Sequence, residues 1–370
     1  MSCRPVALLA PMLLLACAGK GDDTNVDDPT PPGVAVLGGY THTLDGVVVE
    51  TLLAADDRLG IPSDLAVNPR TPDQLWVLNY DANAVVLATG LEGGAIDSTF
   101  YRSFGSDHFL ANPMGIAFSD QGEFATVQDT DELTQGASGT PRDFMGPTLW
   151  DDNLDRFDAG HGSHLDMLHN SPLAGGVAWE ADRIFWVFDG YHEAISRYNF
   201  NTDHGYGGAD HSDGEVARYV QGQVARYEGT PSGLEMDRAT GLLYIADSAN
   251  SRVMALDTAS GERAGAIGPN YDGGQQYRVA DAELLAVFED GDGEVGLITP
   301  SGLAIHDEVV YVADNEAGRI LALSMEGELL DWLDLGREPG ALGGLEVDAS
   351  GNLLFTDMVA VEVVRISPLP

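Results

Sequence analysis

The chain has 370 residues, 44% of them hydrophobic and 21% charged, so it can bury a large core and its composition argues against wholesale disorder. Its 18 Lys and Arg oppose 59 Asp and Glu, which gives a formal net charge of −41 at pH 7. A surface this acidic repels phosphate backbones and argues against nucleic-acid binding; it suits cationic partners, divalent metals or a salty environment, or serves solubility alone. Both cysteines, Cys3 and Cys17, lie at the N-terminus, so the body of the chain has no disulfide and no cysteine-based metal site.

Met1–Ala16 has the features of a signal peptide, because one positive charge precedes an apolar run that is too short to span a bilayer. The run ends in Leu14-Leu15-Ala16-Cys17, which resembles the bacterial lipobox, whose cysteine is lipidated after cleavage. An ordinary secretory signal that ends in Cys by chance is the alternative. The lipobox interpretation predicts an anchor at Cys17 in a membrane of the bacterial cell envelope. The outer membrane is favoured, with the protein periplasmic or surface-exposed. Residues 17–33 then form a flexible acidic linker, and residues 34–370 form the folded domain.

Six later segments share a small-residue motif, a short hydrophobic strand, a turn, and a second strand that ends on Asp or Asn. They are Ile61–Asn79, Asn112–Asp129, Ala174–Asp189, Pro231–Asp247, Pro300–Asp314 and Leu342–Asp357. Their closing residues recur roughly every 40–70 residues, which matches a four-stranded propeller blade with loop insertions.

The predicted strands are short, rich in Val, Ile, Leu, Phe and Tyr, and bounded by Gly, Asp and Asn. No long helical pattern separates them, so they predict antiparallel meanders and an all-β, six-bladed β-propeller. We expect Val47–Leu53 to pair with the last segment, Val361–Pro370, and so to close the ring without an unpaired strand edge. Five or seven blades stay open as alternatives, because Thr130–Asn170 is long enough to hide strands.

The fourth and fifth repeats carry a family resemblance. PSGL followed by LYIADSANSRV (Leu243–Val253), and YVADNEAGRI (Tyr311–Ile320), resemble the NHL repeat of six-bladed propellers. The resemblance covers about Ile61–Pro370 and implies an NHL-type propeller over the folded domain. Ala317 stands where the fourth repeat has Asn250, so the two copies differ in the turn after the Asp.

The Asp or Asn that closes each repeat is the most regular polar feature of the chain. A ring of carboxylates on one face is one interpretation. The favoured one is structural, because an Asp side chain at a strand end accepts backbone N–H bonds from the following turn. Function is more expected where one repeat departs from the others.

The first such departure surrounds the third repeat. GHGSHLDMLHN contains three histidines, and the turn after the third repeat contains a fourth. If the segment before the repeat enters an inner strand, these residues meet near the channel mouth. Imidazoles with a carboxylate suit zinc or another first-row metal. The candidate metal ligands are His161, His164, His169, Asp189 and His192, and surface histidines with separate hydrogen bonds are the alternative.

The second departure is the Gly-rich insertion Asn201–Glu215. Its carboxylates suit calcium, which takes six to eight oxygen ligands, although their spacing matches no EF-hand. The candidate calcium ligands are Asp203, Asp210, Asp213 and Glu215. Strand parity puts this insertion on the face opposite the His192 turn, which argues against one shared site; a solvated loop is the alternative.

A third departure, Asp143–Phe157, carries Phe144, Trp150 and Phe157. These aromatic residues either line a ligand pocket or, as favoured here, attach the insertion to the domain.

No Gly-x-Ser-x-Gly elbow and no phosphate-binding loop occur, so the sequence predicts no serine nucleophile and no nucleotide cofactor. The favoured function is a monomeric binding or scaffold lipoprotein that takes a protein, glycan or small-molecule ligand on one propeller face. A metal-dependent enzyme, lyase or lactonase/hydrolase-like with zinc or calcium, is the alternative. It rests on fold analogy, because the inner-strand motifs carry a histidine only at His306, late in the fifth repeat, where zinc-dependent lyase propellers use three histidines. Asp64 stands near the position of an acidic metal ligand in lactonase propellers. A calcium-stabilised structural protein is the third class.

Overall fold

The computed structural model describes residues 33–370 except residue 104 and the segments 132–141, 158–161 and 290–294. The predicted signal peptide, Cys17 and His161 therefore lie outside the described residues. Within Gly33–Pro370, which forms one compact unit, nearly all regular structure is β-strand. No helix in this part of the chain is long and apolar enough to cross a membrane.

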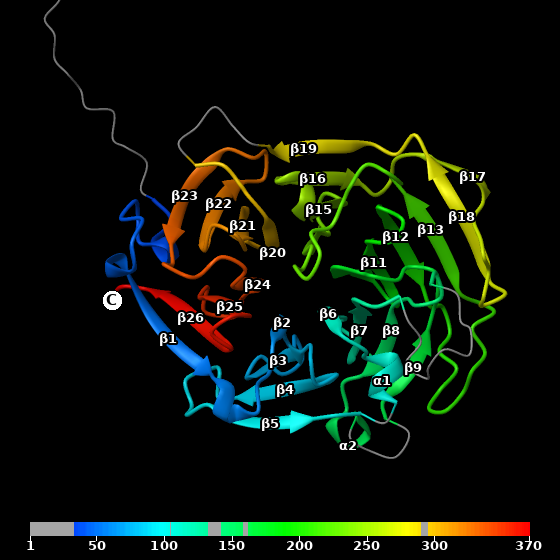
Figure 1. Ribbon diagram of the computed structural model, residues 1–370, viewed down its shortest axis with the longest axis horizontal. Helices are drawn as coiled ribbons and strands as arrows, with labels where there is room; N and C mark the ends of the chain where they lie inside the picture. Colours follow the sequence, from blue (N-terminus) through cyan, green and yellow to red (C-terminus); the bar gives the residue numbers. More distant parts are fainter. Residues whose placement is uncertain (1–32, 104, 132–141, 158–161, 290–294) are drawn as a thin grey trace, which may run out of the picture. The chain divides into compact units, whose positions relative to one another are not determined.

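The strands form six sheets around a ring, so the protein is a six-bladed β-propeller (Figure 1). Blade one is β2 (Pro62–Val67), β3 (Gln74–Asn79), β4 (Ala84–Thr89) and β5 (Asp97–Tyr101). Blade two is β6 (Pro113–Phe118), β7 (Glu123–Gln128), β8 (Thr148–Asp151) and β9 (His164–Met167). Blade three is β10 (Val177–Ala181), β11 (Ile184–Asp189), β12 (Ala194–Asn199) and β13 (Glu215–Tyr219).

Blade four is β14 (Leu234–Asp237), β15 (Leu242–Asp247), β16 (Arg252–Asp257) and β19 (Leu284–Phe288). Blade five is β20 (Pro300–His306), β21 (Val309–Asp314), β22 (Arg319–Ser324) and β23 (Leu329–Asp334). Blade six is β24 (Leu342–Val347), β25 (Leu353–Asp357), β26 (Glu362–Pro368) and β1 (Val47–Leu53). The short helices are α1 (Ser106–Phe109), α2 (Leu154–Phe157), η1 (Ala35–Leu37), η2 (Leu44–Gly46), η3 (Ala55–Asp57) and η4 (Ser248–Asn250).

Ring closure follows the sequence prediction. Strand β1 pairs antiparallel with β26, from Val47 opposite Pro368 to Leu53 opposite Val363. The segment from 130 to 170 supplies β8 and β9, the two outer strands of blade two, so it adds no blade. Six blades are therefore confirmed, and the alternatives of five and seven are wrong.

One hairpin, which the sequence analysis did not predict, leaves its own blade. The segment between β16 and β19 forms β17 (Glu262–Ala266) and β18 (Gln275–Ala280), and β18 pairs parallel with β13. The hairpin belongs to blade four in sequence but joins the outer edge of blade three, and the sheet of blade three therefore has six strands. It brings the β17–β18 turn close to the interface of blades two and three.

Among the described residues, six hydrophobic clusters form the core, and each fills the space between two neighbouring blades. Both faces of every blade are thus covered, as a ring of alternately apolar strands requires. Trp150 and Phe157 are fully buried between blades one and two, which confirms that these aromatic residues attach the insertion to the domain. Phe144 packs against His169 and Tyr271.

Glycine recurs in the inner strands because neighbouring blades meet there backbone to backbone. A Cβ on Gly233 would lie 2.6 Å from the carbonyl oxygen of Ser301. At Gly344 the obstructing atom is Oδ1 of Asp64, at 2.1 Å. This second glycine therefore leaves room for a carboxyl group of the neighbouring blade.

Four of the six closing residues accept backbone N–H groups, as the structural interpretation predicts: Asp189, Asp247, Asp314 and Asp357. The other two differ, since Asp129 pairs with Arg226 and Asn79 donates to the carbonyl oxygen of Arg58. Asp189 Oδ1 accepts the N–H of His192 at 3.0 Å, and Asp357 Oδ1 accepts the N–H of Ala360 at 2.7 Å. Asp247 reaches further and accepts the N–H of Ala225 at 2.7 Å, in the segment that leads into its blade.

Replacing Asp247 tests this role. The buried carboxylate also accepts bonds from Asn250 and from Arg252, at 2.9 and 2.8 Å. Asp247→Ala leaves these donors unpaired, so we expect the free energy of unfolding to fall by about 2–4 kcal/mol. Urea unfolding measures the effect, with Glu262→Ala on the exposed strand β17 as the control. Equal midpoints for the two variants would contradict the structural role.

Candidate functional site

The axis of the propeller holds a cavity of about 540 Å³. All six inner strands line it, and in Figure 1 the innermost strands of the blades surround this axis. Representative lining residues, one from each inner strand, are Asp64, Ile116, Trp179, Glu235, Leu303 and Glu346. The cavity therefore combines aliphatic walls with three carboxyl groups.

Burial raises the pKa of each of these carboxyl groups. The pKa of Asp64 and of Glu346 rises to about 7, and that of Glu235 to about 8. Backbone N–H groups offset part of the effect at two of them: Asp64 Oδ2 accepts from Ile116 at 2.9 Å, and Glu346 Oε1 accepts from Val347 at 2.9 Å. No such bond lowers the pKa of Glu235, which accounts for its larger value.

The three carboxyls also repel one another. The charge of Glu346 raises the pKa of both Asp64 and Glu235, while the guanidinium of Arg238 lowers that of Glu235. Arg238 lies over the Trp179 ring, 4.4 Å from its centre, beside the same cavity. Near neutral pH these carboxyls exist partly protonated, so they can donate or accept hydrogen bonds or pair with a cation.

The sequence analysis named Asp64 but missed Glu235 and Glu346. A signal was present, because both glutamates stand where the other four repeats have Ala66, Ala117, Ala178 and Ala304. Asp64 likewise stands where the other repeats have Gly. The alternation of side chains along a strand predicts which residues share a face of that strand. The sequence pattern alone does not tell whether the face that carries these three side chains lines the channel or packs against the neighbouring blade.

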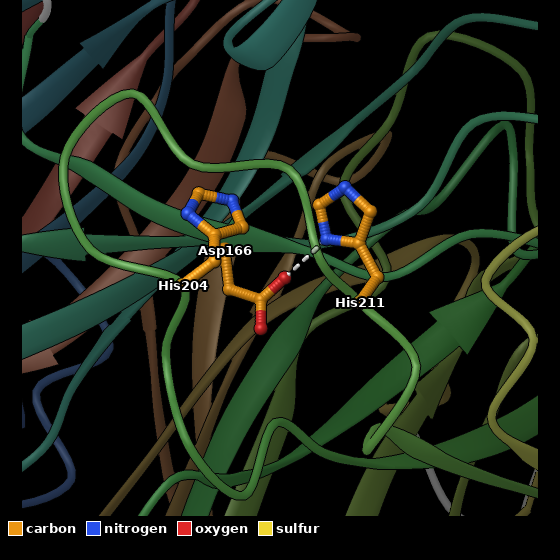
Figure 2. Close-up of side chains that lie close together, drawn as sticks. All are labelled: Asp166, His204 and His211. Atoms are coloured by element: carbon orange, nitrogen blue, oxygen red, sulfur yellow. Dashed lines mark hydrogen bonds and ion pairs between the residues drawn. The ribbon is translucent and has the colours of Figure 1, made fainter.

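A second cluster lies at the outer part of the interface between blades two and three (Figure 2). Asp166 comes from β9, and His204 and His211 come from the loop between β12 and β13. One ligand atom from each of these residues lies within 4.8 Å of the others, so the three could hold a metal ion. His211 Nδ1 lies 2.6 Å from Asp166 Oδ1, the contact drawn in Figure 2.

His164 borders this group. Its ring stacks on Phe109 with 3.8 Å between ring centres, and lies 4.9 Å from the ring of His204. Burial, with the nearby His204 and His211, lowers the pKa of His164 to about 3, so it is a neutral imidazole.

The histidines of the predicted metal site separate in the structure. His164 lies in β9, the outermost strand of blade two, and not in a loop entering an inner strand, so the premise that placed it at the channel mouth is wrong. His169 Nδ1 contacts Asp272 Oδ1 at 2.5 Å, in the β17–β18 turn. His192 Nδ1 contacts Asp189 Oδ2 at 2.9 Å within its own turn. These predicted ligands form no metal group of three within the described residues.

The insertion that carries the predicted calcium ligands meets His164 instead. Strand β12 separates the insertion from the His192 turn, as strand parity predicts. The parity argument did not anticipate that the insertion contacts β9 of the preceding blade. Each candidate calcium ligand has a partner of its own: Asp203 pairs with Arg183, Asp210 with Ser212, Asp213 with the N–H of Thr202, and Glu215 with Tyr277. Calcium binding by this loop stays a prediction.

No family model matches this chain, and no curated protein matches its sequence. Solved structures match its fold. An auxiliary nutrient binding protein from Bacteroides thetaiotaomicron aligns with a TM-score of 0.58 at 11% identity, over 87% of this chain and 76% of that one. A streptogramin B lyase aligns with a TM-score of 0.52 at 11% identity, over 87% and 98%. A luciferin-regenerating enzyme aligns with a TM-score of 0.53 at 14% identity, over 87% and 96%.

These neighbours share the propeller fold of this chain, and at such identities the likeness shows the fold alone. They include a nutrient-binding protein as well as enzymes, so the fold is compatible with both binding and catalysis.

Proposed function

We propose that this protein is an exported, lipid-anchored binding protein of the cell envelope whose axial cavity takes a small organic amine. The observation that carries the proposal is the group of three carboxyls, Asp64, Glu235 and Glu346, on the wall of one cavity. The signal-like segment Met1–Ala16 and the lipobox-like Cys17 support export and anchoring.

Size and charge together favour an amine. A volume of about 540 Å³ lies in the range of ordinary small-molecule sites. An ammonium group compensates the carboxylates that repel one another, and the aliphatic wall and Trp179 suit an apolar or aromatic body. The strongly acidic surface also raises the local concentration of cations near the cavity.

Tyramine and tyrosol make a matched pair of probes, because they differ only in an amine against a hydroxyl. Isothermal titration calorimetry at pH 8 should show tyramine binding at least about 10-fold more tightly than tyrosol, equivalent to about 1.4 kcal/mol. Glu235→Gln should weaken tyramine binding about 10-fold or more and leave tyrosol nearly unchanged.

Glu262→Gln, on an exposed strand outside the cavity, serves as the control and should bind like the wild type. Tighter binding of tyrosol than of tyramine would refute the amine assignment. If neither probe nor other small amines bind, the cavity is not a site for small cations.

A metal-dependent lyase or hydrolase is the second candidate function, favoured by the fold shared with a streptogramin B lyase and by the His/Asp group. This group could activate water only if Asp166, His204 and His211 alone hold the metal and a fourth position stays open. The metal would be zinc or calcium. This candidate takes precedence over binding only if the metal-loaded protein turns over a lactone or ester and a chelator abolishes that turnover.

A further inference from the structure

Three buried side-chain atoms in the cluster between blades two and three have no hydrogen-bond partner within the described residues. They are His164 Nε2, Asp166 Oδ2 and His204 Nε2. Buried polar atoms are nearly always paired, so three of them on neighbouring side chains indicate a shared partner. A carboxylate oxygen and a neutral imidazole nitrogen both offer lone pairs, so a single cation can satisfy all three atoms, whereas one water molecule can donate to only two of them.

The tautomer of His204 supports a cation. Its Nδ1 lies 2.7 Å from the carbonyl oxygen of Gly205 and must therefore carry the proton. Its Nε2 then offers a lone pair toward the cluster, the arrangement that a metal-binding histidine normally has. Between His211 Nδ1 and Asp166 Oδ1, 2.6 Å apart, lies a proton that a metal ion can displace.

Two separations between histidine rings are compatible with zinc. With Zn–N bonds of about 2.0–2.1 Å in a tetrahedral site, the ring centres of two histidine ligands lie about 5 Å apart. The rings of His204 and His211 are 5.1 Å apart, and those of His164 and His204 are 4.9 Å apart. Imidazoles with one carboxylate suit zinc, whereas calcium requires six to eight oxygen ligands.

We propose that Asp166, His204, His211 and His164 bind one zinc ion at the interface of blades two and three. The four residues come from β9 and from the β12–β13 loop, so the ion links the outer strand of one blade to an insertion of the next. The N–H of His204 already bonds to the carbonyl oxygen of Leu165, at 3.2 Å, which sets the loop against β9. The ligand atoms of Asp166, His204 and His211 already lie within 4.8 Å of one another, whereas His164 lies outside this group and must move inward to become the fourth ligand. With His164 bound, no position is left for water and the site is structural, independent of the axial cavity.

The test uses protein purified without a histidine tag. Mass spectrometry should find one zinc per chain, and removal of the zinc by a chelator should lower the melting temperature by several degrees, reversibly on adding zinc. Co²⁺ in place of zinc should give the strong visible d–d bands of a tetrahedral site.

His204→Phe keeps the ring volume and removes the donor atom, so it should fold and lose zinc affinity by more than about 100-fold. His164→Ala should weaken the Co²⁺ bands, because it removes the fourth ligand. His192→Ala, a half-buried histidine bonded to Asp189, is the matched control and should retain zinc.

Wild-type protein without stoichiometric zinc would overturn the proposal, and so would zinc retained in folded His204→Phe. Zinc lost in His192→Ala would place the metal elsewhere. Unchanged Co²⁺ bands in His164→Ala would refute the closed, four-ligand structural site.

Discussion

Deletion of residues 33–53, which contain β1, is expected to abolish cooperative folding. The deletion exposes the edge of β26 along its whole length. It also removes five buried apolar side chains: Val36, Leu37, Val47, Leu52 and Leu53. At about 1.5–3 kcal/mol for each, the loss is on the order of 10 kcal/mol, comparable to the whole stability of a typical domain. Loss of the sigmoidal urea transition, or aggregation of the purified chain, is the measured result.

A rearranged chain tests whether the deletion acts through the lost pairing of β1 with β26 or through the missing residues themselves. Val47 lies opposite Pro368, so a short Gly-rich turn after Pro370 can lead directly into a transplanted β1. Moving residues 47–53 to this position makes β26 and β1 a hairpin, and we expect it to restore much of the cooperative transition. A deletion variant that melts like the wild type would show that the pairing of β1 with β26 does not stabilise the ring.

The second large effect concerns pH. The folded-state pKa values of Asp64, Glu235 and Glu346 lie above their usual values, so between about pH 4.5 and 8 the folded protein binds more protons than the unfolded chain. These groups therefore cost no stability below about pH 4, where both states are protonated. The cost accumulates as the pH rises from about 4.5 to 8 and stays constant above that range. Their contribution to the free energy of unfolding falls over this range.

Glu235→Gln isolates this contribution, because a glutamine resembles the protonated glutamic acid. We expect the free energy of unfolding of the variant to be nearly equal to that of the wild type at pH 5 and about 2 kcal/mol higher at pH 8. This increase is smaller than the full pKa difference would give, because the side chain borders a cavity open to solvent. Urea unfolding at both pH values measures the difference. Glu262→Gln should show no such dependence, and a Glu235→Gln gain that is the same at pH 5 and pH 8 would contradict the burial of the charge.

The same pair of measurements bears on the proposed ligand. A bound ammonium group favours the charged carboxylates, so tyramine should stabilise the wild type more at pH 8 than at pH 5. The extra stabilisation should shrink in Glu235→Gln.

The sequence by itself determined the architecture of this protein. Six copies of one strand–turn–strand pattern, without helices between them, required blades that bury one another's faces, and the strand-like ends at Val47–Leu53 and Val361–Pro370 supplied the closing pair. The role of Asp189 and its equivalents in the turns was also predictable. Hydrogen bonds at the end of a strand join residues that are close in sequence, so a pattern that recurs in every repeat is enough to predict them.

Only the tertiary structure decided where chemistry gathers. Glu235 and Glu346 were visible as departures from alanine, but the sequence could not show that they share a cavity with Asp64. His204 and His211 reach Asp166 because the β12–β13 loop folds back onto the outer strand of the preceding blade. Such contacts join residues of two blades through loops that have no repeat pattern. Their position depends on which side chains pack at the rim and not on the periodicity of the strands.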